Sequence, residues 1–323
     1  MKLDSAVANL LGVDASTATV SSGSGGCSAA STSKITATTP DGQVKNYFMK
    51  SGQDATMFKG EHASLNAIHN VVPSLCPRSY GHGRYESSPS TYFLVTDYLS
   101  LGSRYSSKSS GTSMSLAEKL AKLHTTPAPV PEGHDKPMFG FPVTTCCGDT
   151  PQDNSYKSDW ADFYAENRMR FILRESEKNN GKDKELHDLV EATASRVVPR
   201  LLGNLNGGKG VTPVVVHGDL WSGNTGIGKI DGQDEAEEVV FDPSACYAHS
   251  EFELGICRMF GGFGPKFMAE YHKHNPKTEP VEEYDDRIEL YELYHHLNHH
   301  ALFGGGYRSG AVRMMKDLVR KYG

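Results

Sequence analysis

The sequence lacks any hydrophobic run that could cross a membrane as a helix. Its longest apolar stretches, such as residues 214–216 and 239–241, are only as long as a strand, whereas a membrane-spanning helix needs about 20 apolar residues. The N-terminal stretch MKLDSAVANLLGVDAS has polar residues between its apolar positions and no cleavage-site pattern, which is typical of a short amphipathic helix and not of a secretory signal. We therefore expect a cytoplasmic protein without a membrane partner.

Concentrated positive charge is also missing. Lys and Arg number 33 against 39 Asp and Glu, the formal net charge is −6, and no segment is rich in Lys or Arg. A negatively charged polymer is not drawn to such a surface over distance. The composition therefore argues against nucleic acid as a partner.

Cysteine is scarce and scattered, at Cys27, Cys76, Cys146, Cys147, Cys246 and Cys257. None of these positions has the C-x-x-C spacing of a structural zinc site, and without a secretory signal the thiols are expected to be reduced. The segment HHLNHH (295–300) repeats histidines one helical turn apart, as some zinc sites do, but no third ligand accompanies them. The sequence therefore does not favour a structural metal site.

The order of predicted elements indicates two parts of different character. The first hundred residues favour strands within 17–38, at 43–50 and at 90–98, with one helix at 55–72. A serine-rich loop at 105–115 follows, then helices at 115–124, within 160–202 and from 249 onward, with strands at 212–219 and 237–243 between them. We therefore expect an α+β fold with a small β-rich lobe over residues 1–99 and a larger, mainly helical lobe over 100–323.

A glycine-rich stretch, SSGSGGCS at 21–28, joins the first two predicted strands. Glycine lets the backbone N–H groups of such a loop converge on an anion without obstruction by side chains. Gly23, Gly25 and Gly26 are therefore candidate phosphate contacts. A merely flexible loop is the alternative, and Ser28 stands where a G-x-G-x-x-G pattern has its third glycine.

Lys50 and Glu61 form a second candidate pair. Lys50 ends a predicted strand, and Glu61 lies on the helix that follows it. Each residue alone would be assigned to a solvated surface. Their order after a glycine-rich hairpin matches the kinase arrangement in which the lysine contacts nucleotide phosphates and the glutamate holds it in place.

The stretch HGDLWSGN (217–224) follows an apolar strand and has the kinase catalytic-loop spacing H-x-D-L-x-x-x-N. In that pattern Asp219 accepts the proton of the attacking hydroxyl, and Asn224 offers an oxygen to Mg²⁺. Asp242 follows a second apolar strand and would be the charged Mg²⁺ ligand. Two isolated Asx-turns would explain each aspartate separately, but not both strand ends together. We therefore expect neighbouring strand ends that gather three oxygen donors.

Several longer segments, together with HGDLWSGN, give the chain its resemblance to a known family. They are FKGEHASL (58–65), FGFPVTTCCGDTPQ (139–152), DWADFYAENRM (159–169), DPSACYAHSEFELGICRMFGGF (242–263) and LNHHALFGGGYR (297–308). With them the chain resembles the fructosamine-3-kinase (ketosamine-3-kinase) family, in the aminoglycoside-phosphotransferase-like branch of the protein-kinase fold. The resemblance covers nearly the whole chain, and the TCCG, HSEFEL and MFGGF stretches distinguish this family from aminoglycoside and choline kinases.

The resemblance implies a bilobal protein-kinase-like fold with an antiparallel sheet in the N-terminal lobe, and an activity. ATP, with Mg²⁺, would phosphorylate the 3-hydroxyl of ketosamines, which are sugar adducts of free amines and protein lysines. The product would decompose, so the enzyme would repair glycated proteins. The backbone of Asp97, Tyr98 and Leu99 would contact adenine. A kinase for another hydroxyl, on an aminoglycoside or a choline-like alcohol, is the alternative, and the preferred sugar stays open.

Other residues are candidates for substrate binding or regulation. Trp221, two residues from Asp219, is either a core aromatic or a flat platform for the sugar-amine. His217, Glu251 and His299 are further candidate substrate contacts, although Glu251 could equally be a helix-start carboxylate. Family resemblance also implies that Cys27 can bridge two protomers, which predicts a redox-sensitive homodimer; an inert small residue is the alternative.

Overall fold

The computed structural model describes residues 2–23, 30–102 and 114–323. The chain divides into two compact units, the first formed by Met1–Leu116 with Thr225–Pro243 and the second by Ala117–Asn224 with Ser244–Gly323. The sequence-based division at residue 99 did not include the return of the chain to the first unit. That return follows from strand pairing, because Thr225–Ile230 (β10) pairs with Leu99–Leu101 (β6) across more than a hundred residues of sequence.

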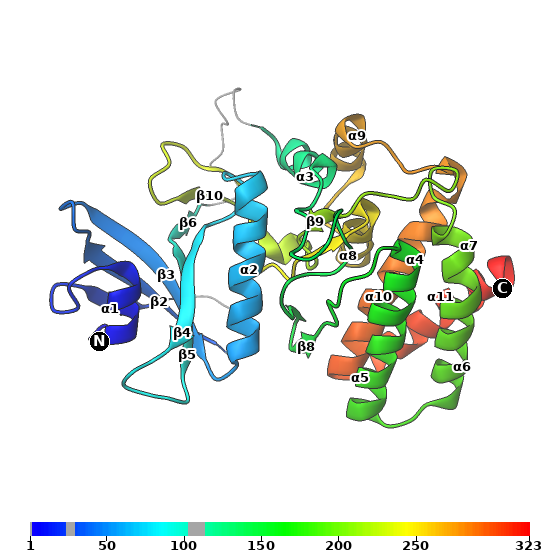
Figure 1. Cartoon of the computed structure of the whole chain (residues 1–323), viewed down its shortest axis with the longest axis horizontal. Helices are drawn as coiled ribbons and strands as arrows, with labels where there is room; N and C mark the ends of the chain where they lie inside the picture. Colours follow the sequence, from blue (N-terminus) through cyan, green and yellow to red (C-terminus); the bar gives the residue numbers. More distant parts are fainter. Residues whose placement is uncertain (1, 24–29, 103–113) are drawn as a thin grey trace. The chain divides into compact units, whose positions relative to one another are not determined.

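The first unit is built on a five-stranded antiparallel sheet in the order β1-β2-β3-β5-β4. Its strands are β1 (Thr19–Ser22), β2 (Ser31–Thr38), β3 (Val44–Gly52), β4 (Ser79–Arg84) and β5 (Tyr92–Asp97), and a second sheet contains β6, β10 and β11 (Glu237–Val240). Figure 1 shows α1 (Ser5–Leu11) on one side of the five-stranded sheet and α2 (Ala55–Val71) on the other. The antiparallel sheet expected from the family resemblance is thus present.

Alternating side chains connect the sheet to its two helices. The residues that pack together with α1 form a buried cluster: Leu3, Val7, Ala8, Ile35, Ala37, Tyr47, Met49, Phe93 and Val95. On α2, Phe58, Leu65 and Ile68 are buried at helical spacing. Asp54 caps α2 by accepting the N–H groups of Thr56 and Met57 at 2.8 and 3.1 Å, which fixes where the helix begins and hence where Glu61 lies.

The second unit is mainly helical, as predicted. Its α-helices are α3 (Leu116–Thr125), α4 (Trp160–Phe163), α5 (Phe171–Asn180), α6 (Lys184–Ala192), α7 (Val198–Leu202), α8 (Glu253–Phe260), α9 (Pro265–His274), α10 (Tyr284–Phe303) and α11 (Gly306–Tyr322). The π-helical turns Tyr164–Arg170 and Thr193–Val197 continue α4 and α6, and 3₁₀ turns lie at Ser222–Asn224, Ser250–Phe252 and Val281–Glu283. Two short antiparallel pairs join β7 (Cys146–Cys147) to β8 (Thr150–Pro151) and β9 (Val214–Val216) to β12 (Cys246–Ala248).

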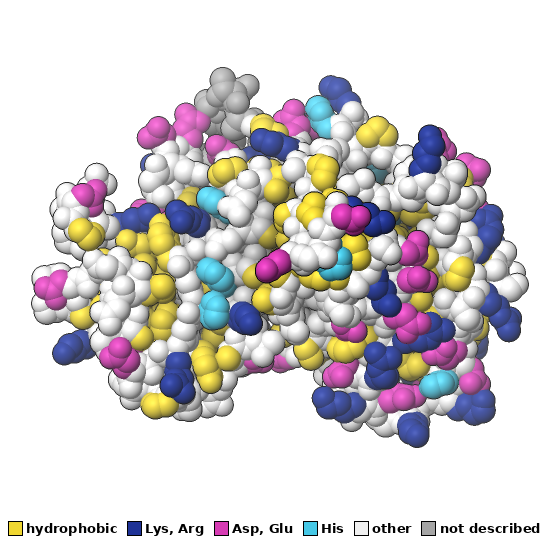
Figure 2. All heavy atoms as spheres, in the orientation of Figure 1, with side chains coloured by type: hydrophobic (Ala, Val, Ile, Leu, Met, Phe, Trp, Pro, Cys, Tyr) yellow, Lys and Arg dark blue, Asp and Glu magenta, His cyan; other side chains and the backbone are white. Residues whose placement is uncertain are grey.

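Helix α10 is the centre of the second unit. It packs against α5, α8 and α11 (Figure 1), and its buried residues lie all around the helix instead of along one stripe. On the face in Figure 2, Lys and Arg side chains are interspersed with Asp and Glu side chains over the helical unit. Among the described residues no helix combines the length and apolar character that a membrane span requires.

The strands before Asp219 and Asp242 belong to different sheets, because β9 pairs with β12 whereas β11 pairs with β10. The expected gathering of three oxygen donors from the two strand ends stays a prediction. The sequence reasoning missed β10, which lies between the two predicted strands. Its sequence, TGIGKI, alternates glycine with β-branched and charged residues, and glycine is normally depleted in strands.

Candidate active site

Two carboxylates of the first unit contact the ammonium group of Lys50. Its Nζ lies 2.7 Å from Glu61 Oε1, on α2, and 2.7 Å from Asp242 Oδ1, directly after β11. Lys50 is only 8% exposed. Burial alone would lower the pKa of its ammonium group, but the two carboxylates outweigh burial and raise the pKa above its ordinary value. Lys50 is therefore a fixed positive charge.

Asp242 combines a constrained backbone with an accessible carboxylate. Its φ of 58° lies in the left-handed region, which residues other than glycine seldom occupy. Such a conformation is typical of positions where function or the surrounding structure requires it. The side chain is 46% exposed despite its contact with Lys50, so a ligand can still reach the carboxylate.

The predicted phosphate loop is described only at its beginning. Gly23 follows β1, and its N–H donates to Thr32 O at 2.9 Å. Gly25, Gly26 and Cys27 lie outside the described residues, and their predicted roles rest on the sequence alone.

Asp97, Tyr98 and Leu99 lead from β5 into β6. The side chain of Asp97 is 7% exposed and is occupied by local bonds, since it accepts Arg78 N–H at 3.0 Å and Tyr80 O–H at 2.5 Å. Tyr98 O accepts the N–H of Asp231 at 2.9 Å. Any adenine contact would therefore be made by the remaining backbone groups of this segment.

In the second unit, the HGD turn is held by the backbone of residue 244. Gly218 has a φ of 82°, and a Cβ atom there would lie 2.1 Å from Ser244 O. His217 O accepts the N–H of Ser244 at 2.8 Å. Only glycine fits this position, and the turn places Asp219 just beyond the end of β9.

Asn224 orients Asp219. Its Nδ2 donates to both Asp219 O and Asp219 Oδ2, each at 2.9 Å, and its own N–H donates to Trp221 O at 2.9 Å. Because both side-chain bonds use the nitrogen, the Oδ1 of Asn224 points to the other side of the amide group. This is the atom that a hard cation would take as a ligand.

Glu253 holds the same loop through hydrogen bonds to its backbone, a role that was not predicted from the sequence. Its carboxylate is 1% exposed and accepts the N–H groups of His217 and Gly218, the latter at 3.0 Å. His124 Nε2 lies 3.5 Å from it. Burial alone would raise the pKa of Glu253, but the contact with His124 and the influence of His217 outweigh burial and lower the pKa. The sequence feature that could have indicated this role is the position of Glu253 in HSEFEL, at the start of α8.

We expect Glu253→Gln to weaken both the fold and the reaction. The amide can accept one of the two N–H groups but presents a donor to the other, and one unsatisfied buried donor costs about 1–3 kcal/mol. Urea unfolding should therefore show a loss of that size, and kcat should fall more than ATP affinity. The matched change Glu282→Gln, at an exposed glutamate, should alter neither quantity; equal stability of the two variants would contradict the role of Glu253.

The candidate substrate residues have different environments. Trp221 is half-buried, and its ring lies 5.6 Å from that of Phe260. A Cβ at Gly223 would lie 2.2 Å from the Trp221 ring, so the loop is shaped around this indole. His299 is also half-buried, with its ring 5.1 Å from Phe260. Trp221 and His299 thus contact one ring, Phe260, which the sequence analysis had not singled out.

His217 and Glu251 are buried structural groups. His217 is 1% exposed, and its Nδ1 accepts the N–H of Asp219 at 3.3 Å. Glu251 is 2% exposed, with its oxygens 2.7 and 3.2 Å from the guanidinium of Arg287 and 2.8 Å from Thr278 N–H. Neither side chain has the exposure that a direct substrate contact requires, so we do not assign one to them.

His249, which lies next to Glu251, is buried in a way that should make the stability of the protein depend on pH. The imidazole is 2% exposed and bonded to Tyr291 Oη and Thr278 Oγ1, both at 2.8 Å. Burial lowers its pKa to about 4 from an ordinary 6.5, while the charge of Glu251 partly opposes this shift. Above about pH 6.5 the imidazole is neutral in both the folded and the unfolded chain, and the stability is at its full value. As the pH falls from 6.5 to 4, His249 is protonated in the unfolded chain only, and this lowers the free energy of unfolding by up to about 3 kcal/mol.

Urea unfolding at pH 7.5, 6 and 5 tests this expectation. The free energy of unfolding should fall toward acid, and His249→Gln should make the decline shallower. His187→Gln, which replaces an exposed histidine, serves as the control and should leave the slope of the unfolding free energy against pH unchanged. A free energy of unfolding that stays level between pH 7.5 and 5 would contradict the prediction.

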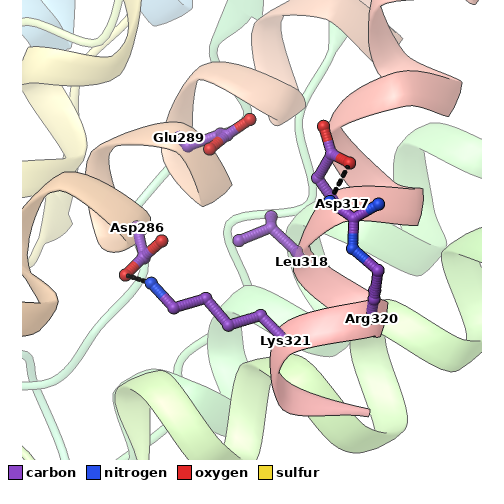
Figure 3. Close-up of a pocket in the computed structure, with 6 residues that line it drawn as sticks. All are labelled: Asp286, Glu289, Asp317, Leu318, Arg320 and Lys321. Carbon is purple, nitrogen blue, oxygen red and sulfur yellow. Dashed lines mark hydrogen bonds and ion pairs between the residues drawn. The ribbon is translucent and has the colours of Figure 1, made fainter.

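Two surface pockets contain none of the predicted site residues. One, of 380 Å³, is lined by Asn66, His69, Asn70 and Arg78. The other, of 440 Å³ (Figure 3), lies between α10 and α11, and ion pairs join Asp286 to Lys321 and Asp317 to Arg320 at its edges. Because these charges are already paired, we assign no function to this pocket.

Comparison with known proteins gives the family. A profile of the fructosamine kinase family matches residues 6–321. The chain is 35% identical to a ketosamine-3-kinase of Mus musculus, over 82% of this chain and 84% of that protein. It is 32% identical to a chloroplastic protein-ribulosamine 3-kinase of Arabidopsis thaliana, over 85% of this chain and 76% of that protein.

Solved structures agree on the fold. A structure assigned to the fructosamine-3-kinases, from Thermobifida fusca, superposes with a TM-score of 0.72 at 24% identity, covering 98% of each chain. An aminoglycoside phosphotransferase in complex with ADP and hygromycin B superposes with a TM-score of 0.55 at 13% identity, also over 98% of each chain. The predicted α+β, protein-kinase-like fold is confirmed, and the chain belongs to the fructosamine kinase family.

Proposed function

We propose that this protein is an ATP-dependent kinase that phosphorylates the 3-hydroxyl of ketosamines, both small adducts and those on protein lysines. Membership of the fructosamine kinase family supports the kinase activity, and the names of the two relatives support this substrate class. The observation that carries the catalytic assignment is the orientation of Asp219 by Asn224, at 2.9 Å, on a turn that only Gly218 permits.

In the proposed reaction Asp219 accepts the proton of the 3-hydroxyl group while the oxygen of that hydroxyl bonds to the terminal phosphorus of ATP. The bond from that phosphorus to the bridging oxygen breaks, and ADP leaves. Lys50, fixed by Glu61, would contact the phosphates, together with Gly23, Gly25 and Gly26. Asp97, Tyr98 and Leu99 would contact adenine through their backbone, and Trp221 and His299 would contact the sugar-amine.

The donor atoms also fit Mg²⁺. The Asp242 carboxylate, 46% exposed, and the amide oxygen of Asn224 are hard oxygen ligands of the kind that this ion prefers. When bound, Mg²⁺ would neutralise charge on the phosphates. Phosphorylation at the 3-position would lead to decomposition of the adduct and release of the amine, which is a repair of glycated protein.

ATP turnover on a panel of substrates tests the proposal. Ribulose-lysine and fructose-lysine should be phosphorylated, the erythrulose adduct completes the comparison of sugars, and unmodified lysine is the blank. Turnover of an aminoglycoside or choline without turnover of any ketosamine would favour the alternative kinase.

Two further expectations stay predictions. The first is the Cys27-linked homodimer, because Cys27 lies outside the described residues. The cytoplasmic location rests on the sequence.

A further inference from the structure

A line of aromatic rings leads away from the proposed catalytic loop across the surface of the second unit. Trp221 contacts Phe260 at 5.6 Å between ring centroids, and Phe260 contacts His299 at 5.1 Å. From His299 the line continues to Phe303 at 5.8 Å and to Tyr307 at 5.0 Å. We call these five residues the aromatic line. Each contact is a specific ring pair at the distance that aromatic side chains favour.

Two members of the line are exposed, one beside Trp221 and one at the far end of the line. Phe260 is 39% and Phe303 70% exposed. Phe303 is the last residue of α10, and its ring lies 6.4 Å, between centroids, from that of Tyr307 on the neighbouring helix. Packing in the fold therefore leaves most of its ring in water. An apolar ring left in water gains stability when a partner covers it, and contiguous apolar surface next to a functional site is typical of a binding surface.

The line carries no charge at neutral pH. Burial lowers the pKa of His299 below its ordinary value, so its ring is neutral. Arg308, which follows Tyr307, is held by Asp183 and Glu185. The surface therefore suits an apolar or aromatic segment better than an anion.

The size of a ketosamine relates this surface to the reaction. In a lysine adduct about nine covalent bonds separate the 3-hydroxyl oxygen from the lysine Cα, which is about 10 Å when extended. This span is comparable with the first two steps of the line, which are 5.6 and 5.1 Å between ring centroids. The lysine backbone and the residues beside it would then lie next to the outer members.

We propose that Phe303 and Tyr307, the outer members of the line, bind the carrier polypeptide beside the modified lysine, with preference for apolar or aromatic neighbours. This inference rests on the proposed function and adds a determinant of substrate choice: the enzyme would prefer ketosamines in apolar sequence surroundings over the same adduct on a small amine. Aromatic side chains are the residues that most often dominate such binding surfaces.

The test compares one ketosamine on three carriers: a small amine, a peptide with Leu and Phe beside the modified lysine, and the same peptide with Gly at those positions. For the parent enzyme, kcat/KM should be highest with the Leu/Phe peptide. In Phe303→Ser the ratio of kcat/KM for that peptide over the small amine should fall about tenfold, while the ratio for the Gly peptide should change little. Val281→Ser, at an apolar residue of the same unit that is 42% exposed, should leave both ratios unchanged.

A Phe303→Ser variant with the parent ratio, or with an equal loss on the Gly peptide, would overturn the inference while leaving the proposed function intact. Absence of turnover on all three carriers by the parent enzyme would instead overturn the proposed function, and this inference with it. Because the side chain is 70% exposed, the variant should fold, and its melting temperature can be compared directly with that of Val281→Ser.

Discussion

Replacing Asp219 with asparagine should lower kcat by about 10²–10⁴-fold, the range expected for loss of a general base. Asparagine has nearly the same shape and can still accept the bond from Asn224 Nδ2, which now lies 2.9 Å from Asp219 Oδ2. The loop should therefore keep its geometry, and the change removes only the ability to take a proton. Steady-state phosphorylation of ribulose-lysine measures the loss, and ATP binding by calorimetry should be nearly unchanged.

Asp188→Asn is the matched control for this variant. Asp188 is an exposed residue of the same unit, paired with Lys184 on α6, and its replacement should leave kcat unaltered. If Asp219→Asn retains kcat within a few-fold of the parent enzyme, Asp219 does not act as the base.

Replacing Asp242 with asparagine should abolish the dependence of ATP binding on Mg²⁺ and lower kcat by about 10²–10³-fold, the several kcal/mol that a catalytic metal supplies. The substitution removes the charged ligand, while Lys50 keeps its ion pair with Glu61 at 2.7 Å. Because Asp242 is 46% exposed, its loss should not unfold the protein. ATP affinity, measured with and without Mg²⁺, separates this effect from a general loss of nucleotide binding.

Asp234→Asn serves as control, since Asp234 is exposed between β10 and β11. Mg²⁺ should strengthen ATP binding to this variant as it does for the parent enzyme. An Asp242→Asn variant that responds to Mg²⁺ like the parent would exclude Asp242 as the metal ligand.

Local patterns predicted much of the fold and of the candidate site. The α2 segment shows its helical spacing and its cap within a few residues, and the catalytic-loop spacing places Asp219 and Asn224 on one turn. Lys50 and Glu61 are eleven positions apart, and the strand-then-helix order brings them together. Such features are readable because the interactions that produce them join residues close in sequence.

Long-range interactions were not readable in this way. Glu251 and Glu253 are two positions apart in HSEFEL, and nothing local distinguishes them. In the structure Arg287, from α10, donates hydrogen bonds to Glu251, whereas backbone N–H groups of the catalytic loop donate to Glu253. Similarly, no pattern in TGIGKI predicted that β10 pairs with β6 and returns residues 225–243 to the first unit.

The sequence by itself determined the order of most elements, the family and the chemical types of the catalytic groups, because spacing along the chain fixes which side chains share a turn or a helix face. Only the tertiary structure decided which carboxylate supports the loop, which strands are neighbours, and that aromatic rings from four segments form one surface. Those outcomes depend on burial and on hydrogen bonds between residues far apart in the chain, and each buried polar group takes whichever partner the packing brings within reach.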